Sequence, residues 1–379
     1  MNKLQLKLKV PKSIFDIISS GVAILVGLFA GFIIMLISNA SQAVWAFVTI
    51  LSSGFSTMND IGQVLYFATP IIMTGLSVGF AARTGLFNIG AAGQFIVGAY
   101  TAILVGVTCG FLPGHLHWIV ALCAAMIAGA IWGALPGLFK ALFNVHEVIA
   151  CIMTNYIGMY LVNFLITRTI YDSTRNQSMS VIDTANVPKL GMDKIFRDGF
   201  IVSSVNSGIL IAITFAILIY FILEKTAFGY ELKACGFNRD AARYAGINEK
   251  RSIIFSMVIA GGLAGLGGAL LFLSGSGVAI NVVDVLAMEG FNGIPVALLA
   301  LNNPIGIIFS GLFIAYLGVG GFNMQLYEFA PQIIDIIIAV IIYFSAFALI
   351  IKGLIVSLNK RRKDEIQASL SQSAEGGEL

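Results

Sequence analysis

The sequence predicts an all-α protein, a polytopic bundle of about ten transmembrane helices. Of its 379 residues, 58% are hydrophobic and only 11% are charged, and the mean hydropathy is +0.93. Soluble domains carry about 25% charged residues. Uncharged apolar runs long enough to cross the hydrocarbon core of a bilayer recur along the whole chain. A water-soluble fold is excluded because it could not bury so much apolar surface.

The predicted spans are uncharged apolar stretches of about 20 residues. They occupy residues 17–38, 61–82, 86–107, 118–139, 146–167, 202–223, 253–275, 286–302, 304–321 and 331–351. The eighth and ninth are short. The segment 41–56 is too short and too polar to span comfortably, and we expect an interfacial or re-entrant piece there.

The positions of the basic residues predict that both termini are cytoplasmic. Cytoplasmic loops of membrane proteins carry the excess of Lys and Arg. With the N-terminus inside and ten crossings, all but five of the 22 Lys and Arg residues fall on the cytoplasmic side. The five exceptions share one external loop: Arg168, Arg175, Lys189, Lys194 and Arg197. Nine or eleven spans would place one of the basic termini outside.

The chain divides into one membrane domain and two cytoplasmic ends. We expect a cytoplasmic N-terminus at 1–16, a membrane domain at 17–351 with a cytoplasmic loop at 224–252, and a disordered cytoplasmic tail at 352–379. The four cysteines lie in or beside apolar runs without CxxC spacing, which argues against a disulfide framework or a metal site. His115 and His117 are expected to be simple residues of a short external turn.

Two similar motifs stand at corresponding places of the two predicted halves. Spans two to five and spans seven to ten run in opposite directions, so a similarity between them is an inverted repeat, which is typical of transporters. Span three opens at 85–90 with Gly-Leu-Phe-Asn-Ile-Gly, and span eight opens at 290–294 with Gly-Phe-Asn-Gly-Ile. Glycine permits a broken helix end, and asparagine offers donors and an acceptor to an uncharged polar ligand.

These residues have two interpretations. For Asn88, Gln94 and Asn292, contact with a solute and hydrogen bonding between helices are equally well supported, because an unpaired amide in lipid is costly. We assign the glycine run Gly261, Gly262, Gly265, Gly267 and Gly268 to close helix packing.

Few ionisable residues lie at membrane depth. Glu147, Asp284, Glu289 and Asp335 all stand near a predicted interface. Asn155 lies deeper and shares a face of span five with Glu147, which makes both of them candidates for a pathway or for a helix contact. An ion-driven carrier generally needs a carboxylate near mid-membrane, and none is predicted there. The energy for transport is therefore expected to come from a partner.

The chain itself is not expected to be an enzyme. It has no GxxxxGK[ST] phosphate loop and no convincing set of nucleophile, base and orienting group. No cofactor and no nucleic-acid partner are expected.

The cytoplasmic loop between spans six and seven contains a predicted short helix. Ala241, Ala242 and Ala245 would give it a narrow surface that can approach another protein closely. Asn238 or Asp240 can cap its start, and Gly246 can end it. Arg239 and Arg243, four residues apart, would project from one face. An ordinary interfacial loop would explain the arginines but not the alanine and glycine pattern.

This loop, from Gly236 to Asn248, resembles the coupling-helix loop of permease subunits in ATP-binding-cassette importers of the ribose and branched-chain amino acid type. Residues 85–94 resemble the family's GLFNIGxxGQ signature, and residues 290–304 resemble GFxGIxVALLxxxNP. Both are typical of the nucleoside branch, which is served by receptors of the basic membrane protein type. His146 stands where this branch usually has Asn, and Ala92 where Glu is common.

The resemblance implies a permease subunit for nucleosides in a bacterial cell membrane. A ribose-type sugar permease, a secondary carrier and a channel remain alternatives. The implied partners are an ATPase subunit that binds ATP, a second homologous permease and an extracytoplasmic substrate-binding lipoprotein. The implied pathway residues are Phe87, Asn88, Gln94, Glu147, Asn155, Phe291 and Asn292. The implied coupling residues are Gly236, Asn238, Arg239, Ala241, Ala242, Arg243 and Gly246.

Overall fold

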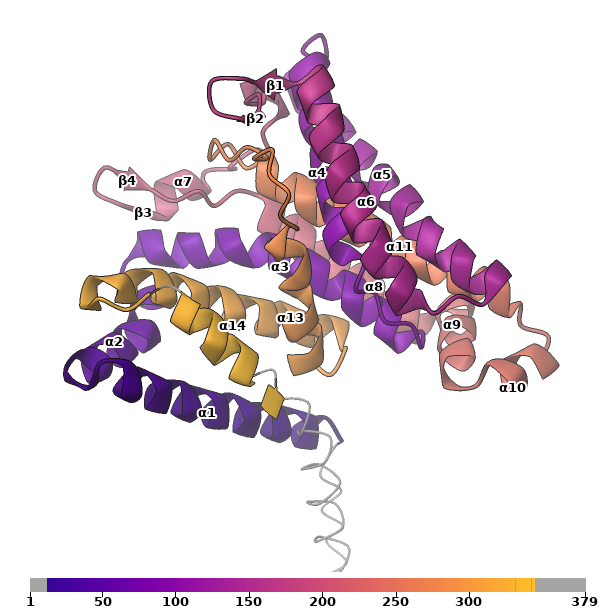
Figure 1. The fold of residues 1–379 in the computed structure, drawn as a ribbon, viewed down its shortest axis with the longest axis horizontal. Helices are drawn as coiled ribbons and strands as arrows, with labels where there is room; N and C mark the ends of the chain where they lie inside the picture. The colour runs from indigo at the N-terminus through magenta and orange to yellow at the C-terminus, as the bar shows by residue number, and fades with distance from the viewer. Residues whose placement is uncertain (1–11, 331, 342, 345–379) are drawn as a thin grey trace, which may run out of the picture.

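A computed structural model describes residues 12–330, 332–341 and 343–344, which form a fan of long helices (Figure 1). The long helices are α1 (Lys12–Ser38), α3 (Met58–Arg83), α4 (Ala91–Thr108), α5 (Gly114–Phe143), α6 (Glu147–Thr169), α8 (Gly208–Lys225), α11 (Glu249–Phe272) and α14 (Pro304–Asn323). The shorter ones are α2 (Ala40–Ser52), α7 (Met192–Ile195), α9 (Ala227–Phe237), α10 (Arg239–Tyr244), α12 (Met288–Phe291) and α13 (Gly293–Leu299).

Local sequence signals fix the ends of several helices. Thr57 and Asp60 form a capping box at the start of α3, which satisfies two of its free N–H groups. Asn303 caps α14, where its Oδ1 accepts hydrogen bonds from Ile305 N (3.0 Å) and Gly306 N (3.3 Å). Pro304 follows at the first helical position, where a missing N–H costs nothing.

Helix α11 lies at the centre of the bundle and packs against α3, α4 and α5. Its glycines allow the backbones to come close. A Cβ added to Gly265 would lie 2.6 Å from Ala125 O and 2.9 Å from Gly129 Cα. Gly261 and Gly268 are equally crowded, by Gly129 and by Phe95. The predicted packing role of these glycines is confirmed, and the contact is of the small-residue kind that joins helices in membranes.

The bundle has two distinct ends (Figure 1). At one end lie two small antiparallel hairpins, in which β1 (Tyr171–Asp172) pairs with β2 (Gln177–Ser178) and β3 (Arg197–Asp198) with β4 (Ile201–Val202). At the other end α9 and α10 project beyond the long helices.

The spans agree with the sequence in most places. Among the described residues, seven helices are long and apolar enough to cross a membrane. They match the predicted spans except for the first, eighth and tenth. Within 331–351, residues 332–341 form a short apolar helix, and the tail at 352–379 lies outside the described residues. The count of ten spans and the inverted repeat remain predictions.

The predicted eighth span is wrong as a continuous helix. Residues 286–302 form the two short helices α12 and α13, which are interrupted at Asn292. The segment 41–56 is largely helical as α2. The expectation for His117 is also wrong, because His117 lies in the first turn of α5 and is fully buried. Its Nδ1 meets Thr184 Oγ1 at 2.9 Å and its Nε2 meets Val105 O at 3.0 Å.

Candidate functional site

A network of buried amides holds the segment between α3 and α4. Asn88 and Gln94 are 0% and 1% exposed. Asn88 Nδ2 donates to Gln94 Oε1 at 2.8 Å, and Gln94 Nε2 donates back to Asn88 Oδ1 at 3.1 Å. Asn88 Nδ2 also donates to Ser77 Oγ of α3 at 3.0 Å. The reciprocal Asn88–Gln94 bonds hold the segment against the start of α4, and the bond to Ser77 holds it against α3.

Asn155 ties the same segment to α6. Its Oδ1 accepts from Gly93 N at 2.8 Å, and its Nδ2 donates to Ile89 O at 3.0 Å. These bonds satisfy backbone groups at the start of α4, where free N–H and C=O groups are otherwise costly inside a membrane. For Asn88, Gln94 and Asn155 the geometry therefore favours hydrogen bonding between helices, and a direct contact with a solute stays a prediction.

The motif 85–90 does not open a helix as predicted. It forms the turn before α4, which begins at Ala91. Phe87 within it is half-buried and packs against the main core. Glu147, the first residue of α6, is buried and forms an ion pair with Lys140 of α5. That pair joins the two ends of the α5–α6 connection, and the carboxylate is not free in this arrangement.

The second motif lies at a helix interruption inside the bundle. Phe291 ends α12, Asn292 separates it from α13, and both are half-buried. A Cβ added to Gly290 would clash with Ala92, and one added to Gly293 would clash with Thr74. The interrupted helix is therefore wedged between α3 and α4 by its glycines.

This wedge brings the backbone of Glu289 beside α3. Thr74 Oγ1 donates to the backbone carbonyl of Glu289 at 3.4 Å. At 1.5 Å per residue, Thr74 lies about 24 Å from the start of α3 and about 13 Å from its end. Glu289 is half-buried and forms no ion pair with any described residue. The sequence placed it near an interface because 286–302 was expected to be a continuous span that begins there.

The short helix predicted between spans six and seven is confirmed as α10. Asn238 is its cap, with Oδ1 accepting from Ala241 N at 3.0 Å. Gly246, with φ +84°, ends the turn after it, a conformation that favours glycine. Ala241, Arg243 and Ala245 are exposed, and Arg239 is half-buried.

One residue of α10 faces the other way. Ala242 is buried, so its side chain does not lie on the exposed face of α10, and its predicted role in coupling stays a prediction. Its small side chain lets α10 lie close to the bundle. The outward face instead carries Tyr244 and, just before the helix, Phe237, which are 94% and 89% exposed.

The loop touches the amide-held segment directly. A Cβ added to Gly236 would lie 2.6 Å from Thr84 C and 2.7 Å from Gly85 N. Arg83, at the end of α3, forms an ion pair with Glu224 of α8, and Lys233 Nζ of α9 lies 3.0 Å from the same carboxylate. The sequence analysis missed this triad because it treated Arg83 and Lys233 only as markers of orientation. Their signal was a lone Glu at the cytoplasmic end of span six.

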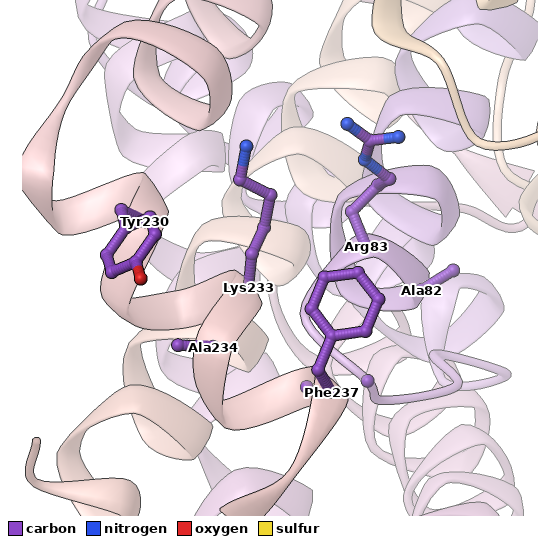
Figure 2. A pocket seen from close by; sticks show the side chains of 8 residues that line it. Ala82, Arg83, Tyr230, Lys233, Ala234 and Phe237 are labelled. Carbon is purple, nitrogen blue, oxygen red and sulfur yellow. The ribbon is translucent and has the colours of Figure 1, made fainter. Parts of the chain in front are cut away.

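Beside this junction is an open cavity of about 480 Å³. Figure 2 shows Arg83 and Lys233 side by side in its wall, with Phe237 next to Arg83 and Tyr230 on the other side of Lys233. The cavity is lined by residues at the end of α3 and by residues of α9. The loop is therefore joined to the bundle through the Gly85–Gly236 contact and the ion pairs, with open space around them.

Comparison with known proteins identifies the family of the chain. The family model for the permease component of the branched-chain amino acid transport system matches residues 61–346. The chain belongs to this permease family.

Two curated relatives cover nearly the whole chain. The guanosine ABC transporter permease protein NupP of Bacillus subtilis is 37% identical over 341 residues, 90% of this chain and 96% of that protein. The nucleoside ABC transporter permease protein NupB of Lactococcus lactis is 35% identical over 338 residues, 87% and 91% of the two chains. A glucose ABC transporter permease protein of Haloferax volcanii is 32% identical over 302 residues, 79% and 78%. No solved structure matches.

Membership of the permease family assigns the helical bundle a role in transport. The chain is a multi-pass membrane protein and a permease component with a function in transport. The chemistry of the described site agrees with such a role, because it offers amides, aromatic rings and the Glu289 side chain, which forms no ion pair with any described residue. Among the described residues, no cluster of three or more His, Cys, Asp or Glu could hold a metal ion.

Proposed function

We propose that this permease carries nucleosides into a bacterial cell as the membrane subunit of an ATP-binding-cassette importer. The observation that carries the proposal is the similarity to two nucleoside permeases. They are 37% and 35% identical to this chain over 90% and 87% of its length. Both hydrogen-bonding amides and aromatic side chains suit a nucleoside, whose base can stack and whose sugar hydroxyls need partners.

ATP would be bound and hydrolysed by a partner subunit. The support lies in α10, a short capped helix that stands outside the bundle with an exposed outward face. Such a helix can enter a groove of an ATPase and move with it. The Gly85–Gly236 contact and the Arg83–Glu224–Lys233 ion pairs would carry that motion to the end of α3.

The remaining partners follow from the same proposal. A second homologous permease would complete the pathway, and an extracytoplasmic lipoprotein would deliver the solute at the end that bears β1–β4. Both termini would then be cytoplasmic, in agreement with the positive-inside rule. Closure of the ATPase pair would rock the permease halves and alternate the access to the solute.

A sugar importer is the second candidate, because the archaeal glucose permease covers about four-fifths of the chain. Uptake in cells separates the two. Cells that express the chain with its neighbouring ATPase, second permease and receptor should take up radiolabelled guanosine, and unlabelled nucleosides should compete while glucose and ribose should not. Competition by the sugars alone would favour the second candidate.

The ATPase contact has its own test. Ala241→Arg places a long charged side chain on the outward face of α10 and should reduce both ATPase association and uptake. Lys250→Ala, in the exposed first turn of α11, is a matched control on the same end of the bundle. Full association of the Ala241→Arg variant would contradict the docking role of α10.

A further inference from the structure

A stripe of polar side chains runs along one face of α6. Tyr156, Tyr160 and Asn163 are four and three residues apart, which places them above one another on a helix. The two tyrosines are 47% and 54% exposed. The neighbouring stripe, formed by Ile157, Leu161 and Phe164, is equally exposed but wholly apolar. Hence α6 presents two adjacent outer stripes of opposite character.

The depth of the tyrosines makes the polar stripe unusual. At 1.5 Å per residue, Tyr156 and Tyr160 each lie at least about 13 Å from either end of α6. Tyrosines of membrane proteins gather at the interfaces, where the hydroxyl can reach water. Neither of these hydroxyls has a hydrogen-bond partner within the described part of the chain. A polar group left unpaired in hydrocarbon is costly, so this stripe is not suited to face lipid.

A second observation places carboxylates beside the same stripe. Asn163 Nδ2 donates to Val283 O at 2.9 Å and to Asp284 Oδ1 at 3.2 Å. Asn163 lies about 9 Å before the C-terminal end of α6 at Thr169. The exposed Asp284, which it contacts, therefore lies alongside α6 and not beyond its end. The chain then reaches Glu289, whose backbone carbonyl accepts a hydrogen bond from Thr74 Oγ1 near the middle of α3. The segment 284–289 therefore carries two acidic residues between α6 and α3, and neither is ion-paired with a described residue.

We propose that the Tyr156–Tyr160 stripe and the segment from Asp284 to Glu289 form the wall of the water-filled solute path. Water would satisfy the tyrosine hydroxyls and hydrate the carboxylates while the path is empty. This inference rests on the proposed import function, and it moves the solute-contacting surface from the buried amides of Asn88 and Gln94 to the exposed face of α6.

The chemistry of this wall fits a neutral solute that is rich in hydrogen-bond donors. The carboxylates of Asp284 and Glu289 can accept bonds from sugar hydroxyls or from ring N–H groups. The rings of Tyr156 and Tyr160 offer flat surfaces for stacking, and their hydroxyls can donate or accept. An anionic solute would be repelled by the two carboxylates. The wall therefore favours uncharged nucleosides over nucleotides.

Cysteine accessibility in the assembled importer tests the proposal. In a chain freed of its four native cysteines, Tyr156→Cys and Tyr160→Cys are compared with Ile157→Cys and Leu161→Cys, which lie at the same depth. A membrane-impermeant maleimide should modify the first pair at least about tenfold faster, because lipid or packed protein shields the second pair from a hydrated reagent. Equal rates for the two stripes would overturn the proposal.

The same variants separate this proposal from the import function. The proposed solute path and the proposed import of nucleosides both predict that guanosine slows the modification of the two cysteines. Fast modification that no nucleoside slows would leave the water-facing stripe intact and count against nucleosides as the solute. If the cysteine variants fail to assemble, Tyr156→Phe with Tyr160→Phe keeps the ring volume and removes only the hydroxyls. Uptake should fall severalfold in this double variant, and unchanged uptake would contradict the role of the stripe.

Discussion

The two Gly–Phe–Asn motifs are similar in sequence but occupy different surroundings. Asn88 is fully buried, and its side-chain amide forms hydrogen bonds with Gln94 and Ser77. Asn292 is half-buried at the interruption between α12 and α13, three residues after Glu289, which has no ion-pair partner among the described residues. The first motif holds three helices together, whereas the second borders the region that we propose as the solute path.

This difference shows that a motif repeated in two halves need not have one role. An asparagine in a membrane protein must find a partner, and the partner can be another side chain or a passing solute. Which of the two applies depends on the neighbouring residues. Gln94 is available to Asn88 six residues later, whereas Asn292 has no equivalent side-chain pairing in the part of the chain that the structure describes.

The largest effect is expected from Asn88→Leu. The change leaves both polar atoms of the Gln94 side chain buried without their present partner, at about 1–3 kcal/mol for each unsatisfied group. Thermal unfolding of the purified chain in detergent should show a large loss of stability. The double variant Asn88→Leu with Gln94→Leu should lose less than the sum of the two single changes. Strict additivity would show that the pair does not act as a unit.

Gly236→Ala comes next. The added Cβ would meet the backbone of Thr84 and Gly85 at 2.6–2.7 Å, so the loop must move away from the end of α3. We expect a loss of stability of about 1–3 kcal/mol, typical of overpacking, and weaker uptake. Gly318→Ala in α14 is the control, because nothing lies within 4 Å of the added atom. Similar behaviour of the two variants would contradict the proposed tight junction.

Asn292→Leu should act on transport rather than on folding. Because Asn292 is half-buried and its side chain forms no hydrogen bond with another described side chain, the assembled complex should form in normal amount. Uptake of guanosine should nevertheless fall severalfold. A loss of assembly similar to that of Asn88→Leu would mean that the two motifs are both structural.

The smallest effect on stability is expected from Arg243→Ala. Arg243 is exposed, and its guanidinium lies 4.0 Å from the Glu249 carboxylate. Exposed ion pairs contribute roughly 0–1 kcal/mol, so thermal unfolding should hardly change. Uptake should fall if this side chain contacts the ATPase. A marked loss of stability would show that the pair matters to the fold itself.

The sequence predicted most of the helices because long apolar runs and caps are local signals. Hydropathy located α3, α5, α6, α11 and α14 closely, and the spacing of Asn238 and Gly246 predicted both ends of α10. The glycine run of α11 was also assigned correctly to packing.

The rest depended on contacts that no local pattern contains. The interruption at Asn292 follows from the wedge of Gly290 and Gly293 against α4 and α3, and hydropathy alone could not distinguish it from a short span. The burial of Ala242 depends on how α10 folds back onto the bundle. The pairing of Asn88 with Gln94 required the turn at 85–90, which the sequence analysis treated as the start of a helix.

The most direct test of the account is ATP-driven uptake in proteoliposomes that contain the chain, its second permease, its ATPase and its receptor. We predict that radiolabelled guanosine accumulates only when ATP is supplied to the ATPase, and that a hydrolysis-deficient ATPase abolishes the accumulation. Accumulation driven by an ion gradient in the absence of the ATPase would contradict the account, and it would point to Glu289 as part of an ion-coupled carrier.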